Sequence, residues 1–191
     1  YMIQRTKRMV RRTVWAIQKQ LKSGEFEPEG VEVVFQGGRI DRVDTMETDD
    51  GKLYVRVIDY KTRNTSFDLV SLYHGLQLQL MIYMDGALTV EQNKHKDKDV
   101  IPAGVFYYNI KDPMIQEKID ADIETVQEKV LKELKMNGLV LKDKELVQKM
   151  DSSLVSIPVS FNKDGSFRKN SSVASKEQFD ILNRYVKTKI S

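Results

Sequence analysis

The sequence predicts an α/β domain in which helices flank a mixed β-sheet. A helix-like segment opens the chain, three strand-like segments follow it, and helical and strand-like segments alternate after that. The order is αβββαβα with further helical segments, which is typical of α/β folds with a mixed sheet.

Composition agrees with a folded domain and excludes several kinds of site. With 40% hydrophobic residues and a net charge of +3, the 191-residue chain is not disordered, and its length fits one domain. The longest apolar runs fall short of the ~20 residues of a membrane-spanning helix. The absence of cysteine excludes disulfides, thiolate nucleophiles and cysteine-bound metal within this chain, and favours a cytoplasmic location. With only His74 and His95, neither a histidine-rich metal centre nor a Ser-His-Asp triad is expected.

The start of the chain predicts a piece of a larger subunit, because Tyr1 is neither an initiator methionine nor part of a signal peptide. We expect one domain over 1–191. It divides into a basic N-terminal helix (1–22), a core (31–110), and helical additions with a C-terminal helix (111–191).

Residues 1–22 predict a helix with a basic face. Apolar residues recur there at helical spacing, and Gly24 ends the segment. It contains seven basic residues and no acidic residue. Two interpretations remain open: the face is simply solvated, or it contacts phosphate groups.

Three strands are predicted next, at 31–36, 39–44 and 53–61. The last two flank the polar, turn-rich stretch 47–52, which predicts an antiparallel hairpin.

The remaining elements follow from periodicity. Residues 68–88 carry a broad apolar stripe and predict a helix. The other predicted elements are a buried strand at 100–110, Lys/Glu-rich helices at 119–136 and 144–150, a short strand at 156–161, a mobile loop at 162–175 and a closing helix at 176–189. Ser175 is placed to cap the closing helix.

Strand 53–61 contains charged residues in an unusual place. Side chains alternate between the faces of a strand, so Leu53, Val55 and Val57 share a face with Asp59 and Lys61. Burying such charges is costly unless they are paired or bind a metal.

Asp41, on the preceding strand, is a candidate partner for Asp59. Directly opposed residues of an antiparallel pair point to the same face. Asp41 therefore joins Asp59 only if the connecting loop has an odd number of residues, centred on Asp50 or Gly51. A two-residue Asp50-Gly51 turn would place Asp41 opposite Tyr60 and separate the carboxylates.

Two converging carboxylates beside a lysine suit a divalent cation. All-oxygen ligands with room for water favour Mg²⁺ or Mn²⁺. Such an ion activates water and stabilises charge on a phosphodiester, while Lys61 would bind a phosphate oxygen or position the water. Spacing alone leaves a structural Asp–Lys pair at a strand end as an equal alternative.

Three motifs in order resemble the PD-(D/E)xK nuclease superfamily, in its RecB-like branch. They are Gly38-Arg-Ile-Asp41, Val57-Ile-Asp59-Tyr-Lys61 and Gln79-Leu-Met-Ile-Tyr83. The surrounding sequence is similar, over nearly the whole chain, to the AddB family of nuclease-bearing subunits in AddAB helicase–nucleases. The resemblance implies a restriction-endonuclease-like core with a mixed central sheet flanked by helices.

The resemblance also implies roles for residues of the hairpin. It makes Asp41 and Asp59 metal ligands, with the backbone carbonyl of Tyr60 as a further ligand. It makes Lys61 the catalytic lysine.

The helix after the catalytic strand supplies the third motif. Gln79 and Tyr83 correspond to the Gln-x-x-x-Tyr motif of the family, and Lys61, Gln79, Tyr83 and Arg63 are expected to contact DNA. From the residues alone, Gln79 could instead be a core-edge side chain bonded to nearby backbone. His74 could approach the metal site, or be an ordinary, partly buried histidine.

Two family features have no counterpart here. The first motif is an acidic residue or histidine on a helix before the first strand, and 1–22 contains neither. We expect that group upstream of Tyr1 or absent, since Glu32 lies on an early strand. The four cysteines that bind a 4Fe-4S cluster in AddB proteins are also missing.

The resemblance therefore implies a Mg²⁺- or Mn²⁺-dependent DNA exonuclease domain of an AddB-like subunit. It would act on the single strand that emerges from an unwound duplex, beside an AddA-like helicase–nuclease subunit, in double-strand break resection and recombinational repair. Two alternatives remain. One is a stand-alone RecB- or Cas4-like exonuclease; the other is a catalytically incomplete DNA-binding module without its first motif and iron–sulfur cysteines.

Overall fold

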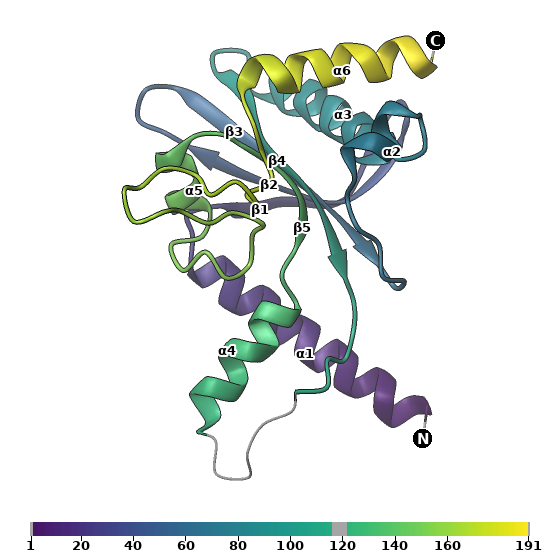
Figure 1. Cartoon of the computed structure of the whole chain (residues 1–191). Helices are drawn as coiled ribbons and strands as arrows, with labels where there is room; N and C mark the ends of the chain where they lie inside the picture. The colour runs from purple at the N-terminus through teal and green to yellow at the C-terminus, as the bar shows by residue number, and fades with distance from the viewer. Residues whose placement is uncertain (1, 116–121, 191) are drawn as a thin grey trace.

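The structure is a computed structural model that describes residues 2–115 and 122–190. Within these residues a six-stranded mixed sheet, in the order β1-β2-β3-β4-β5-β6, has helices on both sides (Figure 1). The predicted α/β class and mixed sheet are confirmed. The elements are α1 (Met2–Lys22), β1 (Glu27–Phe35), β2 (Gly38–Glu47), β3 (Lys52–Lys61), α2 (Leu69–Tyr73), α3 (Gln79–Lys94), β4 (Asp99–Asn109), α4 (Ile123–Glu133), β5 (Asn137–Leu141), α5 (Lys144–Met150), β6 (Val173–Ala174) and α6 (Lys176–Ile190).

The two central strands explain why the chain forms a buried sheet. β1, β2 and β3 pair antiparallel as a meander, whereas β3 and β4 pair parallel through the α2–α3 crossover. Strands covered on both faces read as nearly continuous apolar runs. Val55, Val57, Val105 and Phe106 are accordingly fully buried.

Helices cover the sheet unequally. α3 packs on β3 and β4, and α6 packs on α3 to form an outer layer (Figure 1). α3 approaches the β1–β2 hairpin closely at Gly86, where a Cβ atom would lie 2.4 Å from Cδ2 of Phe35. On the other side, α1 and α4 form a small cluster of their own around Ala16, Val130 and Leu134.

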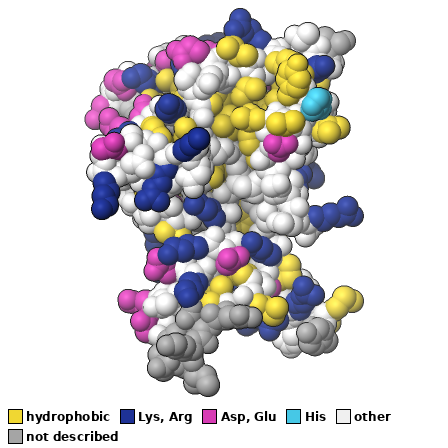
Figure 2. Space-filling model, in the orientation of Figure 1, with side chains coloured by type: hydrophobic (Ala, Val, Ile, Leu, Met, Phe, Trp, Pro, Cys, Tyr) yellow, Lys and Arg dark blue, Asp and Glu magenta, His cyan; other side chains and the backbone are white. Residues whose placement is uncertain are grey.

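The predicted helix 68–88 is wrong as a single element. The chain forms α2 and α3 with a break between Tyr73 and Gln79, and Gly75 in this break has φ of +79°, which only glycine adopts readily. The first half of the expected apolar stripe is therefore exposed: Tyr73 is 66% and Leu76 77% accessible. Figure 2 shows these exposed hydrophobic side chains gathered on one side of the molecule, beside a surface histidine.

Three predictions for the C-terminal third also need correction. Residues 156–161 form no strand, although Ile157 and Val159 are buried, and Pro158 in their midst lacks an N–H for a ladder. The predicted loop 162–175 contains β6, and β5 went unpredicted. The helix predicted at 119–136 is α4, and its expected first turn lies outside the described residues.

The ends of the chain agree with prediction. α1 and α6 occupy the expected segments. Ser175 caps α6: its Oγ accepts from the Gln178 backbone N at 3.2 Å, while the Gln178 side chain accepts from the Ser175 N at 2.8 Å. Among the described residues, no helix is long and apolar enough to cross a membrane.

Candidate active site

The register of the β2–β3 hairpin brings Asp41 and Asp59 together. Arg42 pairs with Ile58 and Glu47 with Leu53, so the loop is centred on Asp50. The next step along this register places Asp41 opposite Asp59. The predicted odd-numbered loop is confirmed, and the two carboxylates share a face.

The carboxylates differ in their surroundings. Asp41 Oδ2 accepts a 2.8 Å hydrogen bond from the backbone N–H of Tyr60. Asp59 is only 4% exposed. Burial is the main cause that raises the pKa of Asp59, and the neighbouring Asp41 adds to it, while Lys61 opposes both.

Lys61 stands between the carboxylates and α3. Its Nζ lies 2.6 Å from Oδ2 of Asp59 and donates to Oε1 of Gln79 at 2.8 Å. The ammonium also lies 5.4 Å from the ring centroid of Tyr107, within range of a cation–π contact. Lys61 keeps 27% of its side chain exposed, so solvent and a substrate can reach it.

The first turn of α3 extends this chain of contacts. Gln79 and Tyr83 are four residues apart and share a helix face. Nε2 of Gln79 donates to the Tyr83 hydroxyl at 2.8 Å, and the Tyr83 ring meets Phe35 edge-on at 5.9 Å. The alternative reading of Gln79, a bond to nearby backbone, is wrong, because both ends of its amide bind side chains.

Tyr107 is a site residue that the sequence did not reveal. It pairs with Asp59 across the parallel strands and is 3% exposed. Burial raises the pKa of its hydroxyl, and Asp59 and Tyr83 raise it further. Nothing in the sequence sets the register of β3 against β4, so no local pattern could have identified this residue.

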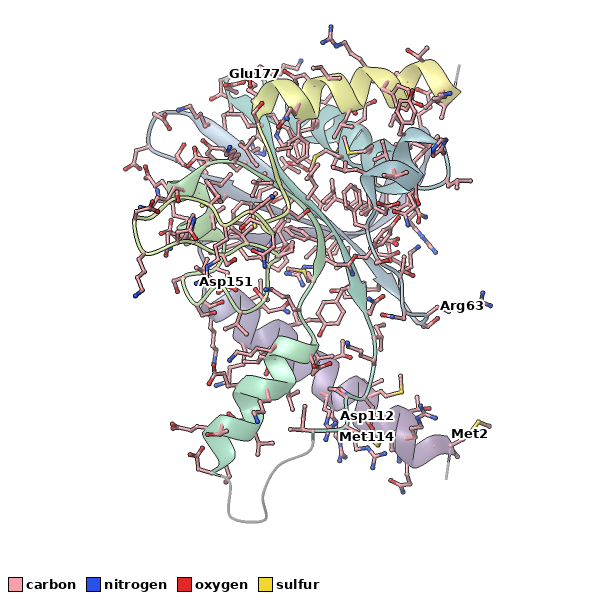
Figure 3. All side chains as sticks on the ribbon, viewed as in Figure 1. Met2, Arg63, Asp112, Met114, Asp151 and Glu177 are labelled. Atoms are coloured by element: carbon pink, nitrogen blue, oxygen red, sulfur yellow. The ribbon has the colours of Figure 1, made fainter. Side chains whose placement is uncertain are left out.

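Other candidate residues lie apart from this cluster. Arg63 is exposed just beyond β3 and projects away from the body of the molecule (Figure 3). His74 is exposed and packs on Tyr73, so neither expectation for it holds. The Tyr60 ring lies on the opposite face of the sheet, against Tyr108.

The basic helix α1 is partly anchored to the fold. Arg8 and Arg12 bind the carboxylate of Asp112 at 2.6 and 2.5 Å, and Figure 3 shows Asp112 beside this helix. Two of its seven basic side chains are therefore not simply solvated. A phosphate contact by the others stays a prediction.

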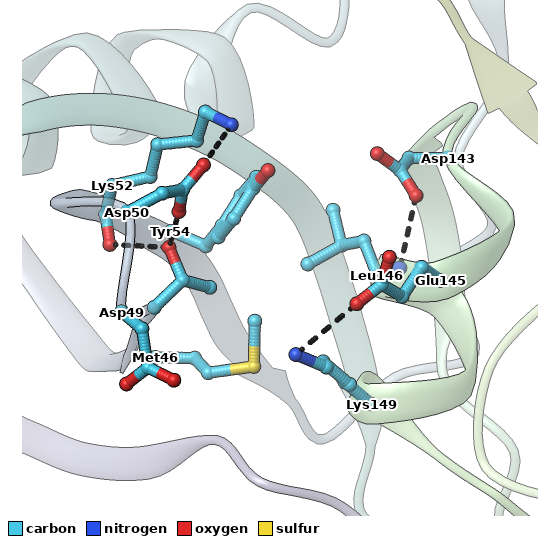
Figure 4. A pocket seen from close by; sticks show the side chains of 10 residues that line it. Met46, Asp49, Asp50, Lys52, Tyr54, Asp143, Glu145, Leu146 and Lys149 are labelled. Atoms are coloured by element: carbon cyan, nitrogen blue, oxygen red, sulfur yellow. Dashed lines mark hydrogen bonds and ion pairs between the residues drawn. The ribbon is translucent and has the colours of Figure 1, made fainter.

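A separate hollow lies at the opposite end of β3, against α5 (Figure 4). Its charged groups largely neutralise one another, since Lys52 pairs with Asp50 and Lys149 with Glu145. It contains none of the predicted site residues.

The residues present fit a divalent cation. Oδ2 of Asp59 is buried and forms an ion pair with Lys61, but it accepts no well-aligned hydrogen bond from the described residues, which leaves a lone pair for a ligand. No group of three or more His, Cys, Asp or Glu converges within the described ranges, so the protein would supply two carboxylates. Mg²⁺ commonly binds through one or two carboxylates and keeps several waters.

Comparison with known proteins places this geometry in a family. The family model described as the PD-(D/E)XK nuclease superfamily matches residues 1–191. The chain is 41% identical over 208 residues to the AddB subunit of the ATP-dependent helicase/deoxyribonuclease of Lachnoclostridium phytofermentans, and 41% identical over 212 residues to that of Clostridium novyi. It is 38% identical over 214 residues to that of Thermoanaerobacter sp. strain X514. The alignments cover 98%, 98% and 100% of the chain, but only 18% of each relative, so the chain spans less than a fifth of their length. The match over the whole chain shows that it belongs to the PD-(D/E)XK nuclease superfamily.

Proposed function

We propose that this chain is the nuclease domain of an AddB-like helicase–nuclease subunit and hydrolyses phosphodiester bonds in DNA. The observation that carries the proposal is the convergence of Asp41, Asp59 and Lys61 at the end of the β2–β3 hairpin. The relatives are named as subunits of an ATP-dependent helicase/deoxyribonuclease, and this name supports DNA as substrate.

Asp41 and Asp59 would hold Mg²⁺ or Mn²⁺, with the Tyr60 carbonyl as a further oxygen. The bound ion supplies an activated water and stabilises charge on the scissile phosphate. Lys61 would neutralise a phosphate oxygen next to Asp59, and Gln79 holds the ammonium in that position. Tyr83 and Arg63 would contact the strand on either side of the scissile bond.

The substrate and partner follow from the same relatives. A nuclease domain within a helicase subunit would receive a single strand as the duplex is unwound, and would shorten it as an exonuclease during break resection and recombinational repair. An AddA-like subunit would complete the complex, which would work on DNA in the cytoplasm. A 4Fe-4S cluster would need cysteines from outside this chain, which has none.

One observation favours a second candidate, a DNA-binding module without catalysis. Only two carboxylates converge among the described residues, and no first-motif residue joins them. This candidate would bind metal and DNA and leave the strand intact. A stand-alone RecB- or Cas4-like exonuclease would share the chemistry, and would act without a helicase subunit.

Cleavage of end-labelled single-stranded DNA by this chain, with Mg²⁺ or with EDTA, tests the proposal. Asp59→Asn and Lys61→Met are each expected to slow cleavage by at least about 10²-fold. Lys52→Met is the matched control, because Lys52 lies on the same strand at its other end. Cleavage that persists in both site variants would overturn the proposal, and calorimetric Mn²⁺ binding without cleavage would favour the DNA-binding module.

A further inference from the structure

A buried charge network lies on the face of the β2–β3 hairpin opposite the carboxylates. Arg42, Asp44 and Arg56 are 5%, 0% and 2% exposed. Arg42 binds both oxygens of Asp44, at 2.6 and 2.7 Å, and Nε of Arg56 donates to the same carboxylate at 2.8 Å. Two arginines thus share one carboxylate that water does not reach.

Stability alone does not account for this network. Removing charges from water is costly, and well-packed apolar residues at such sites often give equal or greater stability. Apolar side chains do fit on this face, since Ile58, the cross-strand partner of Arg42, is 2% exposed.

One contact joins the network to the candidate active site. Nη1 of Arg42 donates to the Tyr60 hydroxyl at 3.3 Å. Tyr60 lies between Asp59 and Lys61, and its backbone N–H donates to Asp41. The same residue is therefore held by its side chain on one face of the sheet and holds a carboxylate on the other.

We propose that Arg42 is a positioning residue that acts through Tyr60, with Asp44 and Arg56 fixing its guanidinium. A fixed Tyr60 sets the direction of its N–H, and this N–H orients the Asp41 carboxylate. Removal of groups that orient metal ligands typically costs about 10–100-fold in metal affinity or activity. The metal-binding consequence rests on the proposed function, whereas the orientation of Asp41 does not.

Three variants isolate this effect. Tyr60→Phe removes only the hydroxyl that Arg42 binds. The triple variant Arg42→Met/Asp44→Leu/Arg56→Met replaces the network by apolar side chains, a change that such buried networks often tolerate. Val147→Ala is the control, because Val147 is fully buried in α5 and its loss destabilises the core without touching the hairpin network.

Two measurements on the folded variants decide the matter: amide hydrogen exchange at residue 60 by NMR, and Mn²⁺ affinity by calorimetry. Tyr60→Phe and the triple variant are each expected to speed exchange at residue 60 and to weaken Mn²⁺ binding about tenfold. Combining them should add nothing further, because both break one pathway. Val147→Ala should keep wild-type values for both.

Unchanged exchange and affinity in Tyr60→Phe would overturn the proposal, even if the triple variant fails to fold. Full additivity of the two changes would also overturn it, because the network would then act independently of Tyr60. If the wild type binds no Mn²⁺ while exchange at residue 60 still responds, the proposed function fails and the positioning role stands.

Discussion

Nζ of Lys61 donates a 2.8 Å hydrogen bond to Oε1 of Gln79, and this bond ties the end of β3 to the first turn of α3. A lysine side chain has several rotatable bonds and loses much entropy when it is fixed. The bond from Gln79 onward to Tyr83 braces the acceptor, so the ammonium is held beside Asp59 before any substrate binds. Helix and strand thus build one site together.

Gln79→Ala is expected to lower kcat on single-stranded DNA by about 10–100-fold, because it removes the acceptor that orients Lys61. Gln92→Ala is the matched control on the same helix, since the Gln92 side chain donates only to the backbone oxygens of His95 and Lys98. Single-turnover cleavage measures both, and equal rates for the two variants would contradict a role for Gln79.

Asp59→Asn is expected to raise the melting temperature at pH 7 when metal is absent. Burial, with help from Asp41, raises the pKa of Asp59 in the folded state. Folding therefore disfavours its ionised form, so stability falls as the pH rises above the unfolded-state value of about 4. The gain should shrink toward pH 4, where the wild-type carboxyl is protonated. Thermal unfolding in EDTA measures this, with Asp99→Asn as an exposed control, and a variant less stable than wild type at pH 7 would refute it.

Mg²⁺ is expected to reverse that order of stability. A ligand that binds only the folded state at 100 times its Kd adds about 2.7 kcal/mol. The wild type should gain this stability, whereas Asp59→Asn should gain little because one of two carboxylates is neutral. Thermal unfolding across a Mg²⁺ series measures the difference, and equal gains would place the metal elsewhere.

Gly86→Ala is expected to destabilise the fold by about 1–3 kcal/mol, because its Cβ would lie 2.4 Å from Cδ2 of Phe35. Phe35 also packs on Tyr83, so cleavage should weaken as well. Phe35→Leu in the same chain should restore part of the stability by making room. Chemical denaturation measures this, and two additive losses would show that the ring and the glycine do not collide.

Asp151→Ala is expected to cost about 2–3 kcal/mol by leaving buried donors unpaired. Asp151 is fully buried and accepts from Ser153 and from both the backbone N and Oγ of Ser156. Burial alone would raise the pKa of Asp151, but the hydrogen bonds from Ser153 and Ser156 outweigh it and lower the pKa.

Stability from Asp151 is therefore present above the unfolded-state pKa of about 4 and is lost as the pH falls through the lower folded-state value. Asp164→Ala is the control, because Asp164 binds Ser166 in a similar way in an exposed turn and should matter little. Denaturation at pH 7 and pH 3 measures both variants. A loss for Asp151→Ala that is as large at pH 3 as at pH 7 would contradict this assignment.

Local relationships made much of the site predictable from the sequence. The loop between β2 and β3 sets the register of that hairpin, so the question of whether Asp41 and Asp59 share a face reduced to whether that loop is odd-numbered. The spacing of Gln79 and Tyr83 likewise fixed their shared helix face.

Contacts between distant segments could not be predicted in the same way. β5 and β6 are short, and their pairing depends on neighbours far along the chain. Tyr107 meets Asp59 only through the parallel register of β3 and β4, which the α2–α3 crossover sets. The break at Gly75 was missed because the apolar spacing continues across it while the backbone does not.

The hairpin loop at 48–52 also limits how this protein can change in length. One residue added to or lost from the loop would turn Asp59 toward the face of Arg56, unless a bulge absorbed the change. Two residues would leave both carboxylates where they are. Length variation in this exposed turn should therefore be accepted in steps of two, although the loop itself contributes no side chain to the site.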